Sequence, residues 1–182
     1  MAPLDDAVRR ERLEALVAST YVPLQCYLRR RTDQAAADDV LGDVLLVMWR
    51  RVDDVPTDMP LAWCYAVARG CLANAVRREG RQRRLLHRLS QQPQPSHAAG
   101  SEDPDLEEAL AALPPGDQEV LRLWAWEQLA PREIAVVLGV TPNAASIRLH
   151  RATRRLREKL GAGKERGGGG QIDPRRGTEA PR

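Results

Sequence analysis

One stretch in the last third of the chain constrains its fold more than any other part of the sequence. Pro131 and Pro142 are followed by helix-type apolar spacing, Gly139 stands between the two segments, and Thr141 is a candidate N-cap for the second one. Proline is well tolerated at the first position of a helix, where the missing N–H would have no partner in any case. The spacing predicts a short helix over 131–138, a tight turn and a longer helix over 142–160. This is the layout of a DNA-reading helix-turn-helix.

The two faces of the predicted second helix differ in chemistry. At 100° per residue, an apolar stripe is expected to pack on the first helix, and it comprises Ala145, Leu149, Ala152, Leu156 and Leu160. Asparagine can pair with adenine, arginine with guanine or phosphate, and isoleucine can touch a thymine methyl group. A solvated basic face is the alternative, but the turn chemistry and an exposed isoleucine among arginines favour DNA. The candidate contact residues on or beside the opposite face are Asn143, Ser146, Ile147, Arg148, Arg151 and Arg154. Arg148 and Arg155, on the shoulder of this face, suit phosphates.

Helical periodicity extends through most of the chain, and strand-type alternation is almost absent. We therefore predict an all-α protein, with further helices over residues 5–31, 34–53, 60–90, 105–112 and 116–128. The polar segment SQQPQPSHAAGSEDPD predicts a flexible linker, and the Gly-rich sequence after Leu160 predicts a disordered tail. The expected organisation is a helical domain over 1–89, a linker over 90–105, a helix-turn-helix domain over 106–160 and a tail over 161–182.

The net charge of +3 is unevenly distributed along these parts. Residues 1–92 carry +3, residues 93–127 carry −7, residues 128–160 carry +5 and the tail carries +2. Two basic blocks separated by an acidic one suggest two patches for a polyanion.

The second and third predicted helices carry less decisive patterns. Asp39, Asp43 and Leu46 share one face of the second helix, which is either an acidic docking face or a solvated one. The third helix is apolar at its start and strongly basic at its end. Trp63 and Tyr65 precede the basic run, and aromatic and basic side chains together suit single-stranded DNA. Taken alone, Trp63 is more often a core residue than a platform for a base.

Four strings, in this order, make the chain resemble a bacterial RNA polymerase sigma factor of the sigma-70 family, in the small extracytoplasmic-function (ECF) group. The first two are DDVLGDVLLVMWRR and PLAWCYAVARGCLANAVRR, similar to family regions 2.2 and 2.3–2.4. The other two are LAALPPGDQEVLRLWAWEQL and PREIAVVLGVTPNAASIRLHRATRRL, similar to regions 4.1 and 4.2. The resemblance covers about residues 15–160 and implies a region 2 bundle followed by a region 4 helix-turn-helix.

The resemblance also implies roles for individual residues. Asp39, Asp43, Leu46 and Trp49 match the surface that docks on the coiled coil of the polymerase β′ subunit. Trp63, Arg69, Asn74, Arg77 and Arg78 match the helix that opens and reads the −10 promoter element. Trp124 and Trp126 match the segment that meets the β-subunit flap, although one of them is expected to be packed. The face of six residues on the helix over 142–160 matches the reader of the −35 element.

The sequence departs from the family pattern at four positions. Gly42 stands where the family usually has Gln in the docking face, and Gly70 where it often has an Asn that helps to capture a flipped base. Ala130 replaces a frequent Ser cap, and Gln128 replaces a frequent Gly. The predicted linker is long enough for both domains to bind one promoter. Fully extended, its residues span ~53 Å, whereas two DNA elements one and a half turns apart are separated by ~50 Å.

The implied protein is a transcription initiation factor, with core polymerase and promoter DNA as partners and an anti-sigma factor as a further candidate. The alternative is a stand-alone helix-turn-helix regulator that acts without polymerase. Neither an enzyme nor a metal or cofactor site is expected, since Cys and His lack ligand spacing and GAGKE at 161–165 lacks most of a phosphate loop. No stretch is apolar enough for membrane insertion, so a cytoplasmic location is expected. Cys26, Cys64 and Cys71 are interpreted as small apolar fillers.

Overall fold

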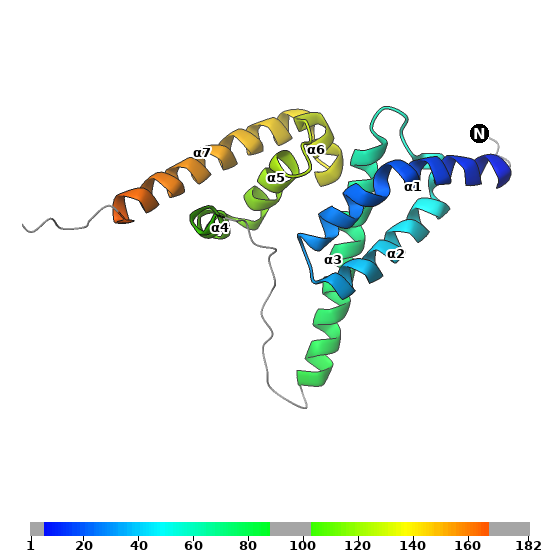
Figure 1. Ribbon diagram of the computed structural model, residues 1–182, viewed down its shortest axis with the longest axis horizontal. Coiled ribbons are helices and arrows are strands. Elements are labelled where there is room, and N and C mark those ends of the chain that lie inside the picture. Colours follow the sequence, from blue (N-terminus) through cyan, green and yellow to red (C-terminus); the bar gives the residue numbers. More distant parts are fainter. Residues whose placement is uncertain (1–5, 88–102, 168–182) are drawn as a thin grey trace, which may run out of the picture.

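The computed structural model describes residues 6–87 and 103–167, and all regular structure in these ranges is helical, as predicted (Figure 1). The first group comprises α1 (Asp6–Arg29), α2 (Gln34–Arg50), the short 3-10 helix η1 (Val52–Asp54) and α3 (Pro60–His87). The second group comprises α4 (Pro104–Ala111), α5 (Pro115–Ala125), α6 (Pro131–Leu138) and α7 (Pro142–Gly167). We refer to the two groups as the N-terminal unit and the C-terminal unit.

Two predicted boundaries are wrong: the end of the last helix and the C-terminal end of the linker. Helix α7 does not end at Leu160 but continues to Gly167, so the first part of the predicted disordered tail is helical. The segment GAGKE is therefore the end of a helix and not a phosphate loop. The expected linker is also too long at its C-terminal end, because α4 begins at Pro104 with Asp103 as its N-cap. The rest of the expected linker up to residue 102, and the tail from residue 168, lie outside the described residues.

The N-terminal unit packs α1, α2 and α3 around a core of aliphatic side chains. Its most deeply buried members include Leu24, Leu28, Val40, Val44 and Met48. Helix α2 begins where Asp33 accepts a hydrogen bond from the backbone N–H of Ala36, a favourable N-cap. The apolar positions of α2 turn inward, so its acidic positions remain on the surface.

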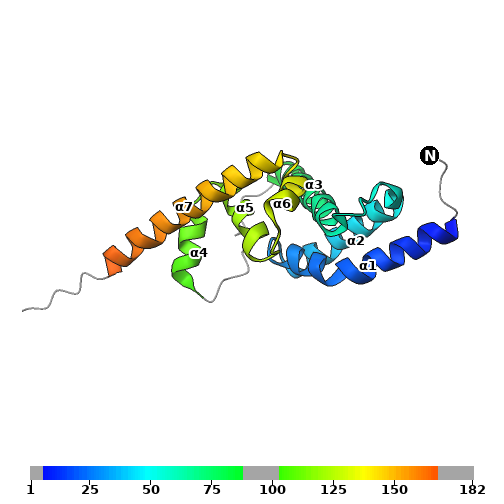
Figure 2. The ribbon, with the colours of Figure 1, turned by 90° about the horizontal axis from the view of Figure 1, so that it is seen from above.

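The C-terminal unit builds a second, smaller core. Leu110 of α4, Leu113 of the following turn and Leu121 of α5 pack on Ala152 of α7. The apolar stripe of α7 was predicted to face only the first helix of the helix-turn-helix. In the structure its N-terminal part packs on α6, while its middle packs on α4 and α5. Figure 2 shows α4 and α5 on the same side of α7, with α4 running away from it.

The two units are in direct contact, which the sequence did not predict. Helix α6 packs against α3, and both views show these helices side by side (Figures 1 and 2). Ile134 and Ala135 of α6 belong to the same buried cluster as Tyr65 and Ala68 of α3. The N-terminal unit and the helix-turn-helix therefore share one continuous core.

Candidate nucleic-acid interface

The turn of the helix-turn-helix is built by local backbone chemistry. Gly139 ends α6 with φ of 65°, a left-handed conformation that glycine adopts without steric cost. The N–H of Val140 then donates to the carbonyl of Ala135 at 3.0 Å. Thr141 caps α7, because its Oγ1 accepts from the N–H of Ala144 at 3.2 Å. The turn predicted from Gly139 and the following Thr-Pro pair is confirmed.

The entry to α6 shows what two departures from the family pattern do to the backbone. Glu133 reaches back to accept from the N–H of Ala130 at 2.8 Å, but the methyl side chain of Ala130 can accept nothing in return. Only half of a capping box is therefore formed. Gln128 has φ of 54°, the one non-glycine residue with a positive φ among the described residues. A glycine would hold this conformation with less strain.

Helix α7 is anchored on one side only. Ala145 and Ala152 are fully buried, and Leu149 and Leu156 are half-buried beside them. Arg155, which the sequence suggested as a phosphate contact, instead forms a short ion pair with Asp117 of α5. This pair ties the middle of α7 to the start of α5. The sequence offered no signal for it, because the two residues are 38 positions apart.

The opposite side of α7 is exposed from Asn143 to Arg154. All six residues of the predicted DNA-reading face are exposed, and Ile147 keeps 44% of its surface accessible. Arg154 makes an exposed pair with Glu158 at 3.5 Å, which solvent screening renders weak. The structure thus brings the predicted −35 residues together on one accessible helical face: Asn143, Ser146, Ile147, Arg148, Arg151 and Arg154.

Helix α3 carries the predicted −10 residues in two different environments. Arg69, Asn74, Arg77 and Arg78 are exposed, and Arg77 donates from Nη2 to the Asn74 side-chain oxygen at 2.5 Å. Trp63 is half-buried, packs on the core of the N-terminal unit and has the Arg51 guanidinium 5.6 Å from its ring centroid. The four polar residues are all accessible, although Arg69 and Arg78 lie on opposite sides of the helix, whereas Trp63 combines packing with partial exposure.

The interpretation of Tyr65 as part of a single-strand surface is wrong. Tyr65 is 2% exposed, and its ring lies 5.1 Å from that of Tyr27 between the two units. Burial raises the pKa of both phenols well above the ordinary value of 10. These rings are therefore neutral structural groups.

The predicted core-docking residues of α2 lie on its outer face. Asp39 and Asp43 are exposed, and Leu46 and Trp49 keep 54% and 39% of their surfaces accessible. Arg9 of α1 extends this face, because its guanidinium lies 5.7 Å from the Trp49 ring centroid. Sequence reasoning missed Arg9, since a contact 40 residues away leaves no local pattern.

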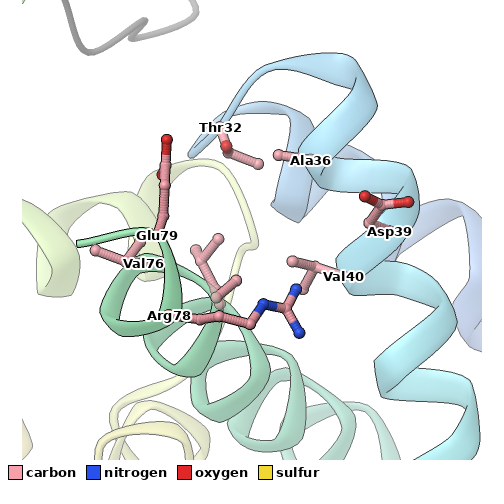
Figure 3. A pocket seen from close by; sticks show the side chains of 9 residues that line it. Thr32, Ala36, Asp39, Val40, Val76, Arg78 and Glu79 are labelled. Atoms are coloured by element: carbon pink, nitrogen blue, oxygen red, sulfur yellow. The ribbon is translucent and has the colours of Figure 1, made fainter. Parts of the chain in front are cut away.

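A shallow hollow of about 220 Å³ separates the two predicted functional faces of the N-terminal unit. Asp39 and Val40 of α2 line one wall, and Val76 and Arg78 of α3 line the other (Figure 3). Figure 3 shows the Arg78 side chain reaching across the hollow toward α2. The acidic face of α2 and the basic face of α3 are consequently neighbours.

Other side chains divide between packing and exposure. Trp124 is 49% exposed, whereas Trp126 is half-buried against the core of the C-terminal unit. Cys64 and Cys71 are buried, and burial raises the pKa of the Cys64 thiol to about 11. Cys26 is exposed, so its interpretation as an apolar filler is wrong. Within 6–87 and 103–167, no His, Cys, Asp and Glu side chains gather as a metal site would require.

An anchored helix-turn-helix whose exposed face carries the residues predicted to read bases is the arrangement expected of a DNA-binding transcription factor. The family described as "Sigma-70, region 4" matches residues 104–156. The RNA polymerase sigma-E factor of Streptomyces avermitilis is 30% identical over 133 residues, which are 70% of this chain and 73% of that protein. The RNA polymerase sigma factor CarQ of Myxococcus xanthus is 28% identical over 158 residues, 84% of this chain and 91% of that protein. The chain belongs to the sigma-70 family of bacterial RNA polymerase sigma factors, in its ECF group.

The fold agrees with this assignment. The structure of CnrH in complex with the cytosolic domain of CnrY matches with a TM-score of 0.57 and 26% identity, covering 82% of this chain and 88% of that one. The protein is thus a transcription initiation factor, and the alternative of a stand-alone regulator is not favoured. None of the helices in the described part of the chain is long and apolar enough to cross a membrane.

Proposed function

We propose that this sigma factor directs core RNA polymerase to promoters through three surfaces, of which α7 reads the −35 element. The observation that carries this proposal is the exposed face of α7 on a helix fixed from behind by α4, α5 and α6. Arg151 lies near the centre of that face and is suited to a guanine contact in the major groove. Arg148 and Arg154, beside it, are suited to phosphates.

The N-terminal unit supplies the other two surfaces. The exposed residues of α3 read the opened −10 element, namely Arg69, Asn74, Arg77 and Arg78, with Trp63 nearer the N-terminal end of the helix. The α2 face with Asp39, Asp43, Leu46 and Trp49 docks on core polymerase. An exposed leucine and an exposed tryptophan within an acidic surface support a protein partner, because such side chains contribute strongly to binding when they are covered. On this division, the N-terminal unit serves polymerase and the −10 element, and the C-terminal unit serves the −35 element.

The partners follow from these surfaces. Core polymerase performs the chemistry, so the chain has no catalytic residue, no cofactor and a cytoplasmic site of action. An anti-sigma factor is a further proposed partner, because the structurally similar sigma factor RpoE of Bartonella quintana was solved in complex with the anti-sigma factor NepR. Two separate basic faces on DNA also imply that promoter binding falls steeply with salt.

Run-off transcription tests the proposal directly. The purified chain, added to core polymerase and a promoter identified by selection from a random library, should start transcripts at one position. The matched control is Arg10→Ala, which removes an exposed arginine from α1 outside all three surfaces and should leave transcription unchanged. A chain that neither binds core polymerase nor supports transcription would contradict the proposal. Tight, core-independent binding to duplex promoter DNA would favour a stand-alone regulator.

A further inference from the structure

The most deeply buried charges described in the chain lie between its two units. We call the four residues Arg30, Arg31, Glu119 and Glu127 the interdomain ion cluster. The side chains of Arg31 and Glu127 are 6% and 2% exposed. In each of the ion pairs outside the cluster, both side chains are more exposed than these two. No surface proposed for core polymerase or DNA includes these four residues.

The cluster is extensively bonded. Arg31 Nη1 lies 3.0 Å from Glu127 Oε1, and Arg30 Nη1 lies 2.9 Å from Glu127 Oε2. Arg31 also contacts Glu119 through Nε and Nη2, both at 3.3 Å. Tyr27 supports the arrangement, because its ring lies 3.7 Å from the Arg31 guanidinium and its hydroxyl donates to Glu119 at 3.4 Å. Each glutamate therefore meets at least two groups of the other unit.

The cluster can exist only while the units are packed together. Its arginines and glutamates are 88 to 97 residues apart in the chain and come from different units. If the units separated, all four charges would return to water, and Ile134 and Ala135 of α6 would lose their cover from α3. A buried charge left without its partner is strongly unfavourable, so the cluster makes the packed state sensitive to single charges.

The packed state also keeps the two proposed DNA-reading helices close together. Helix α6 has eight residues, about 12 Å, and it packs on α3 at an interaxial distance of ~8–10 Å. Helix α7 follows after a turn of three residues. The α7 face therefore begins within roughly 25 Å of α3, about half of the roughly 50 Å between elements one and a half DNA turns apart.

We propose that the interdomain ion cluster holds the sigma factor in a compact resting form, and that the two units must separate before both faces can contact one promoter. The inference rests on the proposed function, because it assigns a resting state to the same two DNA-reading faces. The apolar contact of α6 with α3 supplies cohesion, and the ion cluster decides which way the units face each other.

Small-angle X-ray scattering of the full chain tests the structural half of the proposal. Glu119→Gln/Glu127→Gln keeps side-chain volume but leaves Arg30 and Arg31 without anionic partners, so the radius of gyration should rise. The matched control is Glu11→Gln/Glu14→Gln on the exposed side of α1, which changes the net charge by the same amount and should stay compact. An unchanged radius for the first variant, with circular dichroism showing an intact helix content, would overturn the proposal.

Titration of core polymerase tests the regulatory half. If the compact form is the resting one, Glu119→Gln/Glu127→Gln should give half-maximal run-off transcription at a sigma concentration about fivefold lower than wild type. Expansion without this shift would overturn the inference. A wild-type chain that never supports transcription would instead count against the proposed function, and the scattering comparison would still decide whether the cluster holds the units together.

Charge reversal provides a second, independent variant. Glu127→Arg places a third positive charge against Arg30 and Arg31 and should expand the chain more than Glu127→Gln does. Adding Arg30→Glu to Glu127→Arg restores one ion pair and should recover part of the compaction. A merely destabilising mutation would show no such recovery, so its absence would contradict a specific role for the cluster.

Discussion

The two helices proposed to read promoter DNA differ in how they distribute packing residues and proposed DNA contacts. In helix α7 the two roles lie on different sides, with Ala145 and Ala152 buried on one side and the residues proposed to read DNA exposed on the other. Helix α3 mixes them, since Trp63 is half-buried in the core of its unit and belongs to the proposed −10 surface as well. Asn74 and Arg77 are likewise exposed but hydrogen-bonded to each other. Recognition and stability should therefore be separable in α7 and coupled in α3.

Under the proposed function, the physical reason for this difference is that α7 would contact duplex DNA and α3 would contact unpaired bases. A helix that enters the major groove of an intact duplex can be a rigid rod held from behind, because base edges are already accessible there. A helix that captures unpaired bases needs apolar or aromatic surface for stacking, and such surface is costly to leave fully in water. Partial burial of Trp63 reduces that cost in the free protein.

The largest expected difference comes from truncating one apolar residue in each helix. Trp63→Ala should lower the free energy of unfolding by about 2–3 kcal/mol, because part of the ring is packed in the core. Ile147→Ala should change it by less than about 0.5 kcal/mol, since the side chain is 44% exposed. Urea denaturation of both variants measures the two values. Equal losses of stability would remove the contrast between the helices.

An arginine in each helix gives the next largest effect. Arg151→Ala should weaken binding of a −35 duplex by roughly 10- to 100-fold, the range for loss of a good base contact. Arg77→Ala should leave that duplex affinity unchanged and instead reduce opening of the −10 element by holoenzyme. Fluorescence anisotropy with the duplex and permanganate footprinting of holoenzyme measure the two effects. A loss of core affinity in Arg151→Ala would contradict its placement on a DNA face.

Two residues with left-handed backbone in the C-terminal unit should give the smallest effects, with opposite signs. Gln128→Gly relieves a positive φ on a residue with a side chain and should raise the free energy of unfolding by about 0.5–1 kcal/mol. Gly139→Ala forces a side chain into the same region and should lower it by about 1 kcal/mol. Thermal denaturation checks both variants. Destabilisation by Gln128→Gly would show that the Gln128 side chain contributes contacts that outweigh its backbone strain.

Local sequence signals were sufficient to predict the positions of most of the helices. Pro131, Gly139, Thr141 and Pro142 were sufficient to locate α6 and the turn after it, because caps and left-handed turns depend on residues a few positions apart. The end of α7 was misplaced for a similar reason, since glycines after Leu160 lower helix propensity without forbidding a helix. The exposure of the proposed α7 face also followed from periodicity alone, once the apolar stripe had been recognised.

Contacts between distant residues could not be predicted in this way. Tyr65 was taken for a surface aromatic, but it lies against Tyr27 at the boundary of the two units. Arg155 was assigned to phosphates and instead binds Asp117. In both cases the side chain alone is compatible with either role, and the partner decides between them.

The sequence by itself determined that this protein is helical, that it carries a helix-turn-helix and that its basic residues form two blocks. Only the tertiary structure decided that the two units share a core and bury four charges, Arg30 and Arg31 with Glu119 and Glu127, between them. Periodicity reports which residues of one helix turn away from water. It contains no information about which distant surface covers them, because that depends on the complementarity of shapes and charges formed only when the chain has folded.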